Sequence, residues 1–263
     1  MNHTMKITLT FFLATILFLG ASAQSKKKKE AQKQEAQQAQ IQAQPPAEQP
    51  SVDRPDTTQR VDILMQHFFR KYSVAVQWGD DQVAKDALYD MIIRNPGNDS
   101  LIYSLAVLYY QEQKYTSSLL VGMELLKRNP KDQAFLEISA ASSESLGVID
   151  RSLQYYESLY LLTSSTATLY KVAFLQYDLK RFAESMTNAD ILLTKPDVET
   201  LKVSFNDAQS KPKEYPMKVA VLNLKGLLKM QLGDNVAAKK IFGEALAISP
   251  DFVPVKESLA KLK

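Results

Sequence analysis

The sequence predicts an all-α protein, a solenoid of about five helix-turn-helix repeats closed by a C-terminal capping helix. Small residues recur every 33 or 34 positions from about Met65 onward, in two separate series. One series is Ala84, Ser118, Ser152 and Ser185, followed by Ala238, and the other is Ala106, Ala140, Ala173 and Gly226. A shared period of this length, with apolar residues at helical spacing, is typical of stacked helix pairs. One interval of 53 residues, between Ala173 and Gly226, predicts an insertion.

Before the repeats, residues 1–23 read as a secretory signal peptide. Lys6 gives the positive start, residues 9–19 are almost wholly apolar, and Ala21-Ser22-Ala23 offers small residues for cleavage. The run is shorter than the roughly 20 residues of a membrane-spanning helix, although an uncleaved anchor stays open because Ile7 and Gly20 could lengthen it. We therefore expect an exported protein, periplasmic or secreted. The absence of cysteine excludes a lipoprotein, disulfides and thiol chemistry.

Residues 24–56 are predicted to be a low-complexity, flexible tail rich in Lys, Gln, Ala and Pro, because they hold too few large apolar residues to form a core. Lys26, Lys27, Lys28 and Lys29 could make a weak contact with an anionic surface, or could merely flank the cleavage site. Residues 51–263 carry 26 basic and 26 acidic residues. A neutral body of this kind is a poor polyanion binder, so we expect no nucleic acid partner.

The solenoid is predicted over residues 57–263. Each expected pair has two apolar stripes joined by a short turn, and most pairs end at a proline. The expected pairs are 63–76 with 83–92, 102–109 with 119–126, 135–140 with 153–159, 169–177 with 182–193, and 221–230 with 237–248. A short amphipathic end with Val255, Leu259 and Leu262 should cap the last face.

The last pair carries a family resemblance. The residues from Asn223 through Gly233-Asp234 to Ala238, followed by Phe242-Gly-Glu-Ala-Leu-Ala-Ile-Ser-Pro250, resemble the tetratricopeptide repeat (TPR) consensus. Three features depart from it: Tyr72 stands where a small residue is expected, the third unit lacks its proline, and 53 residues replace 34 before the last unit. The resemblance implies a right-handed superhelix whose first helices line a concave groove, and hence a protein or peptide partner.

When the expected helices are placed in the geometry of that family, one face of the first helices is rich in aromatic side chains. The residues that the resemblance places toward the groove are Phe69, Tyr103, Val107, Tyr110, Glu137, Glu144, Tyr170, Phe174, Tyr177, Asn223 and Met230. Aromatic side chains give large contact areas at small entropic cost. The alternative for each aromatic residue is that it packs between helices.

Family members that grip a chaperone's terminal carboxylate use basic residues on this face. Here the face is aromatic, small or acidic, with Glu137, Glu144 and Asp178, so carboxylate capture is not expected. The insertion, near residues 200–218, is expected to be a helix extension followed by a proline-broken connection. A loop folding over one end of the groove is the alternative.

No catalytic or metal-binding pattern stands out. His67 is the one histidine beyond the signal peptide and is expected to be a partly exposed packing residue, and no glycine-rich phosphate loop is present. We therefore expect no enzyme activity and no cofactor, and an envelope scaffold that binds another protein. The alternatives are a structural protein that self-associates and an accessory subunit of an envelope enzyme or secretion complex.

Overall fold

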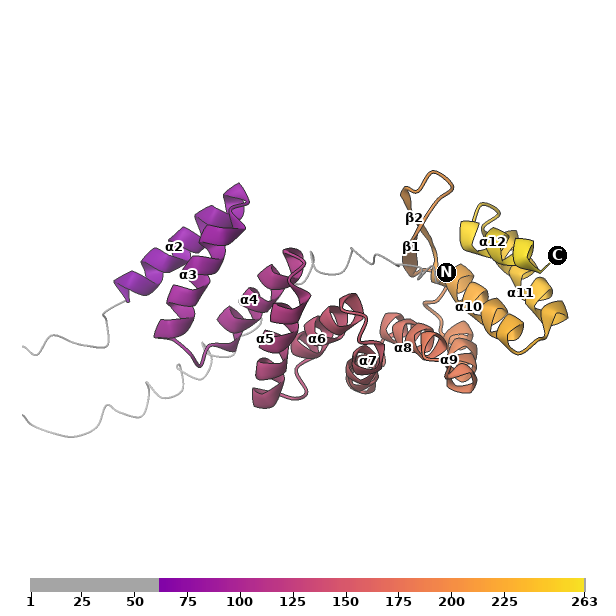
Figure 1. Ribbon diagram of the computed structural model, residues 1–263, viewed down its shortest axis with the longest axis horizontal. Helices are drawn as coiled ribbons and strands as arrows, with labels where there is room; N and C mark the ends of the chain where they lie inside the picture. Colours follow the sequence, from indigo (N-terminus) through magenta and orange to yellow (C-terminus); the bar gives the residue numbers. More distant parts are fainter. Residues whose placement is uncertain (1–61, 263) are drawn as a thin grey trace, which may run out of the picture. The chain divides into compact units, whose positions relative to one another are not determined.

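The computed structural model describes residues 62–262. The predicted signal peptide, the predicted tail and Lys26–Lys29 lie outside the described residues. Within them the chain forms eleven helices and one two-stranded sheet (Figure 1). No helix in this range is both long and apolar enough to cross a membrane.

The helices pack as consecutive pairs, and each pair also packs on the next. The pairs are α2 (Ile63–Trp78) with α3 (Asp81–Arg94), α4 (Asp99–Gln111) with α5 (Tyr115–Arg128), α6 (Gln133–Ser145) with α7 (Ile149–Thr163), α8 (Thr166–Asp178) with α9 (Phe182–Thr194), and α10 (Met217–Gln231) with α11 (Asn235–Ile248). The predicted helical solenoid of five pairs is therefore confirmed.

The turns inside the pairs need a left-handed residue, and glycine provides it in three of the five. Gly79, Gly147 and Gly233 have φ of 70°, 73° and 77°. Gln113 and Lys180 take the same conformation at φ 60° without glycine. Because the expected turns coincide with these residues, the boundaries between first and second helices follow the sequence prediction closely.

The two series of small residues meet inside each pair. The hydroxyls of Ser118, Ser152 and Ser185 donate to the carbonyls of Ala106, Ala140 and Ala173 at 2.8, 3.0 and 2.7 Å. All six residues are fully buried. The small side chains let the two helices approach closely. Each of these carbonyl oxygens has two lone pairs, so it can accept from the serine hydroxyl as well as from a backbone N–H of its own helix.

Some first helices of neighbouring pairs contact each other directly. Helix α4 contacts α6 and α8 contacts α10, whereas in the described chain no comparable contact joins successive second helices. At these two steps the first helices are therefore closer together than the second helices.

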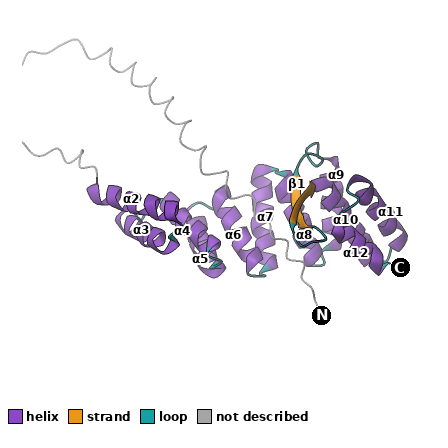
Figure 2. Ribbon diagram, turned by 90° about the horizontal axis from the view of Figure 1, so that it is seen from above, coloured by secondary structure: helices purple, strands orange, loops and turns teal. Residues whose placement is uncertain are grey.

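The insertion is a β-hairpin, so the expected helix extension is wrong. Strand β1 (Lys202–Asn206) pairs antiparallel with β2 (Pro212–Pro216), as Figure 2 shows. Val203, Phe205 and Tyr215 are buried on one face of the hairpin. The alternation of polar and apolar residues in Lys-Val-Ser-Phe-Asn is the strand signal, and the two prolines in β2 disfavour helix.

The hairpin is anchored on the C-terminal end of the chain. The Phe252 ring meets the rings of Phe205 and Tyr215 edge to face, with centroids 4.9 and 4.8 Å apart. The expected capping helix is α12 (Val253–Lys261), which packs on α10 and α11 through the fully buried Val255.

Candidate partner-binding face

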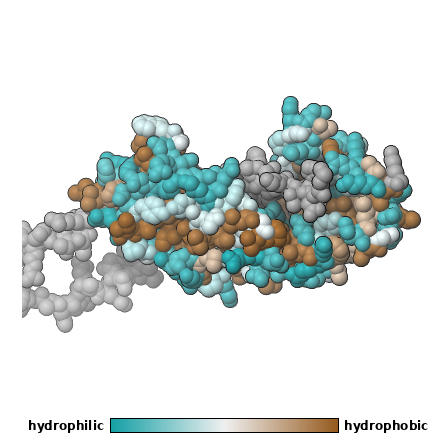
Figure 3. Space-filling model, in the orientation of Figure 1, coloured by the Kyte–Doolittle hydropathy of each residue, from teal (hydrophilic) through white to brown (hydrophobic). Residues whose placement is uncertain are grey.

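The residues predicted to face a partner lie on the five first helices, α2, α4, α6, α8 and α10. We call the side of α4, α6, α8 and α10 that carries them the inner face. In the view of Figure 3, apolar residues gather in a band across the middle of the pairs, with hydrophilic residues above and below it.

Four aromatic residues of the inner face are half-buried, and each contacts one other ring. The Tyr110 ring meets Tyr115 at 5.3 Å between centroids, and the Tyr177 ring meets Phe182 at 5.8 Å. Each of these partners begins the second helix of the same pair. The Tyr103 ring meets Phe135, on α6 of the next pair, at 5.9 Å between centroids, and the Phe174 ring meets Tyr170, on the same helix, at 6.4 Å. These rings are thus held in place on one side while part of each stays accessible.

Polar contacts join the first helices of successive pairs into one continuous row. Tyr110 Oη on α4 lies 3.4 Å from Ser145 Oγ on α6. Lys171 Nζ on α8 donates to both carboxylate oxygens of Glu144 on α6, at 2.8 and 3.0 Å. Gln231 Nε2 on α10 donates to Tyr177 Oη on α8 at 3.4 Å. Residues separated by several tens of positions in the sequence therefore form one surface.

The inner face carries more negative than positive charge. Glu144 is paired with Lys171, but Glu137 and Asp178 make no hydrogen bond or ion pair with any residue that the structure describes. Burial raises the pKa of Glu137. Burial, and then the nearby Glu144 charge, raise the pKa of Asp178 to about 6, while Lys171 acts in the opposite direction. Both unpaired carboxylates would be stabilised by a cation from a partner.

The tyrosines on this face are held in the neutral form. Burial, and then the charges of Glu137 and Asp132, raise the pKa of Tyr103 to about 12. Burial is also the main cause of the raised pKa of Tyr110 and of Tyr177. Their hydroxyls can therefore donate hydrogen bonds to a partner across the physiological pH range.

Three predicted residues are placed differently from the rest. Tyr170 and Asn223 are 5% and 3% exposed, so they offer little surface to a partner in this conformation. Asn223 Oδ1 has no hydrogen-bond partner within the described part of the chain. Phe69, on α2, is 59% exposed. The remaining predicted residues, Val107, Glu137, Glu144 and Met230, are half-buried.

The sequence interpretation missed two residues that shape this face. Lys171 neutralises Glu144, and Tyr156, on the second helix α7, donates its hydroxyl to Glu144 Oε2 at 3.3 Å. Lys171 lies within α8, the first helix of the next pair, directly after the predicted residue Tyr170. Because Lys171 is already paired with Glu144, it does not supply a free positive charge for a terminal carboxylate. Carboxylate capture is therefore still not expected.

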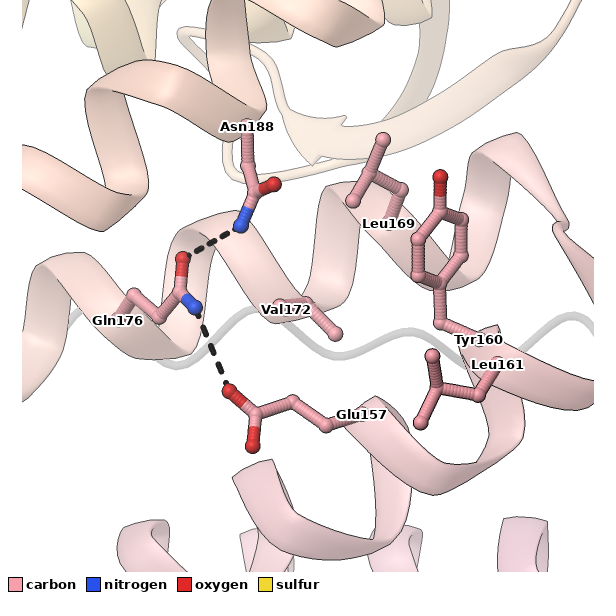
Figure 4. Close-up of a pocket in the computed structure, with 7 residues that line it drawn as sticks. All are labelled: Glu157, Tyr160, Leu161, Leu169, Val172, Gln176 and Asn188. Atoms are coloured by element: carbon pink, nitrogen blue, oxygen red, sulfur yellow. Dashed lines mark hydrogen bonds between the residues drawn. The ribbon is translucent and has the colours of Figure 1, made fainter.

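A separate cavity opens between α7, α8 and α9 (Figure 4). It measures about 300 Å³ and is lined by Glu157, Tyr160, Leu161, Leu169, Val172, Gln176 and Asn188. Asn188 Nδ2 donates to Gln176 Oε1 at 2.8 Å, and Gln176 Nε2 donates to Glu157 Oε1 at 3.4 Å. Leu169 is buried and Leu161 is exposed at the rim, and the paired amides are accounted for by packing between α7, α8 and α9.

Groups that could perform metal chemistry do not converge in the described residues. No three His, Cys, Asp or Glu side chains between residues 62 and 262 lie close enough together to hold a metal ion. His67 is exposed and stacks edge to face on Phe68, with the ring centroids 5.7 Å apart. The inner face presents rings, hydroxyls and carboxylates.

Comparison with solved structures finds the same architecture in tetratricopeptide repeat proteins. A tetratricopeptide repeat protein from Parabacteroides merdae matches with a TM-score of 0.60 and 19% identity, over 76% of this chain and 72% of that one. YrrB, described as a TPR protein with an unusual peptide-binding site, matches with a TM-score of 0.59 and 9% identity, over 73% and 90%. The MamA protein matches with a TM-score of 0.56 and 12% identity, over 76% and 96%.

By sequence, no family model and no curated protein matches this chain. At these low identities the structural matches establish the fold. The chain is thus a helical solenoid of the tetratricopeptide repeat type.

Proposed function

We propose that this protein is a non-catalytic scaffold of the cell envelope, which binds a segment of another protein on its inner face. The export predicted from residues 1–23 supports the envelope as its location. YrrB, with the same fold, is described as having a peptide-binding site.

The observation that carries the proposal is the row of contacts from Tyr110 through Glu144 and Lys171 to Tyr177 and Gln231. It aligns half-buried rings and hydroxyls from α4, α6, α8 and α10 along one surface. Partly buried tyrosines are the residue type that most often anchors an interface. The unpaired carboxylates of Glu137 and Asp178 favour a segment that carries Lys or Arg side chains.

Affinity capture from an envelope extract tests the proposal with two matched double variants. Tyr110→Ala/Tyr177→Ala removes two rings of the inner face, whereas Leu120→Ala/Leu161→Ala removes side chains on α5 and α7 that are 62% and 83% exposed. We expect a protein that co-purifies with the wild type to be lost with the first variant and kept with the second. Equal loss in both, or in neither, would argue against the inner face as the binding surface.

A further inference from the structure

The hairpin has one strand edge whose hydrogen-bonding groups are unused. Met217 N donates to Leu201 O and Asp207 N donates to Lys211 O, both at 2.8 Å, at the two ends of the hairpin. In an antiparallel pair the hydrogen-bonded residues alternate, so Val203 and Phe205 bond to β2 as well. The backbone N–H and C=O groups of Lys202, Ser204 and Asn206 therefore point away from β2.

These outward groups have no other partner in residues 62–262. None of them takes part in a hydrogen bond outside the hairpin, and among the described elements β1 packs chiefly on β2 and α10. Lys202 and Asn206 are exposed, and Ser204 is half-buried. The outer edge of β1 can thus accept a further strand.

The opposite edge of the hairpin is blocked. By the same alternation, Pro212, Glu214 and Pro216 face outward from β2. Proline has no N–H, so this edge keeps a single outward donor, at Glu214. Prolines on an edge strand are a common protection against strand addition. One edge of the hairpin is protected and the other is open.

We propose that β1 pairs with β1 of a second copy of this chain, antiparallel and about a two-fold axis at Ser204. This interface goes beyond the proposed function, since it uses a different part of the molecule. It forms a four-stranded sheet in the order β2, β1, β1 of the second copy, β2 of the second copy.

The register about Ser204 is self-complementary. It aligns all five residues of each strand and joins all the outward groups of Lys202, Ser204 and Asn206. It places Lys202 opposite Asn206 of the second copy, and Val203 opposite Phe205 of the second copy. The two copies of Lys202 are then four residues apart along the sheet, about 13 Å, which is beyond the Debye length at physiological salt. No like charges face each other, so the second copy is the occupant that this edge fits.

The prolines of β2 also explain why the pairing would stop at two copies. After β1 has paired with β1, both outer edges of the sheet are β2 strands, each with Pro212 and Pro216. A sheet bounded by proline edges does not extend further. The interface is therefore closed and gives dimers, without larger assemblies.

Cysteine cross-linking tests the register directly, because the chain has no cysteine of its own. In Ser204→Cys the two sulfur atoms lie across the two-fold axis, where opposite Cα atoms are about 5.5 Å apart, within the range of a disulfide. We expect rapid formation of a disulfide-linked dimer of the full chain under mild oxidation. Glu214→Cys, on the protected edge, should stay monomeric on a non-reducing gel. Equal cross-linking of the two variants would overturn the proposal.

Light scattering provides the second test. Ser204→Pro removes an outward N–H and fixes φ at position 204, while the N–H groups of Val203 and Phe205 that face β2 stay in place. Glu214→Pro makes the same change on β2. We expect the wild type and Glu214→Pro to show twice the monomer mass, and Ser204→Pro to dissociate at least tenfold more readily. A wild-type chain that stays monomeric at high concentration, or a Ser204→Pro chain that dimerises as well as the wild type, would refute the pairing. A monomeric wild type would leave the inner face's function untouched.

Discussion

At the scale of single residues, the fold depends most on places where two helices leave no room for a side chain. A Cβ added to Gly226 would lie 2.6 Å from Phe242 Cδ1 and 2.8 Å from Phe242 Cζ. Gly243, in the neighbouring helix α11, would meet nothing within 4 Å. Both glycines lie inside helices, so the same substitution has two different consequences.

We expect Gly226→Ala to lower the free energy of unfolding by about 1–3 kcal/mol, because the Phe242 ring has to shift in a packed core. Gly243→Ala is the matched control and should raise stability by roughly 0.5–1 kcal/mol through helix propensity alone. Chemical denaturation of the three proteins measures both values. A Gly226→Ala chain as stable as the wild type would show that α10 and α11 do not approach this closely.

A second residue-scale prediction concerns Asp178. Its pKa of about 6 in the folded chain lies above its ordinary value of 3.8, chiefly because of burial. The folded state then binds the proton more tightly than the unfolded state, so this group's contribution to stability is complete below pH 3.8 and is lost as the pH rises through 6.

Asp178→Asn removes that titration. We expect the variant to be more stable than the wild type at pH 8, and the difference to shrink toward pH 4. Thermal unfolding at the two pH values measures it, with Asp150→Asn as the control, since Asp150 lies on the second helix α7 and is not part of the inner face. A difference that is independent of pH would contradict the raised pKa.

At the scale of elements, the C-terminal end is held by rings more than by charges. Phe252 is fully buried between Phe205 and Tyr215. Asp251 pairs with Lys213 and accepts from Tyr215 Oη at 3.2 Å, but Lys213 and Asp251 are about half exposed.

We expect Phe252→Ala to destabilise the chain by about 3–5 kcal/mol, through loss of burial and the cavity left behind. Asp251→Ala should cost less than about 1 kcal/mol, as exposed ion pairs do. Hydrogen exchange of the hairpin amides distinguishes the two variants. Equal protection in both would mean that the ring cluster does not anchor the hairpin.

The elements show where sequence reasoning succeeds. The helix pairs were predictable because each repeats the same constraint, with small residues at Ala106 and Ser118 and again at Ala140 and Ser152. The hairpin has no repeat to support it. Its five-residue strands carry only a short alternation of polar and apolar residues, and they pack on Phe252, which lies several tens of residues later.

On the inner face, too, part of the arrangement could be predicted from the sequence and part could not. The register predicted which side chains share a helix face, but burial depends on the neighbouring pair. Tyr170 and Asn223 occupy the register position of Tyr103 and Glu137, yet they are buried whereas the other two are half-exposed. The pairing of Glu144 with Lys171 and Tyr156 requires the distances between three helices, which no single helix pattern contains.

At the scale of the whole molecule, the surfaces that hold the pairs together differ from the surface proposed to bind a partner. Each pair buries small residues between its own two helices and further apolar residues against the neighbouring pairs, so stability comes from within pairs and from the contacts between neighbours. The first helices keep half-buried rings and unpaired carboxylates on the inner face. The hairpin edge is a third surface, separate from both.

The most direct measurement of the central claim is photo-cross-linking from single positions. A photoreactive phenylalanine analogue at Phe174 reports on the inner face, and one at Leu161, which is 83% exposed on α7, is the control. The account predicts a discrete cross-linked partner protein from Phe174 and none from Leu161. Cross-linking of the same partner from Leu161, with none from Phe174, would contradict it.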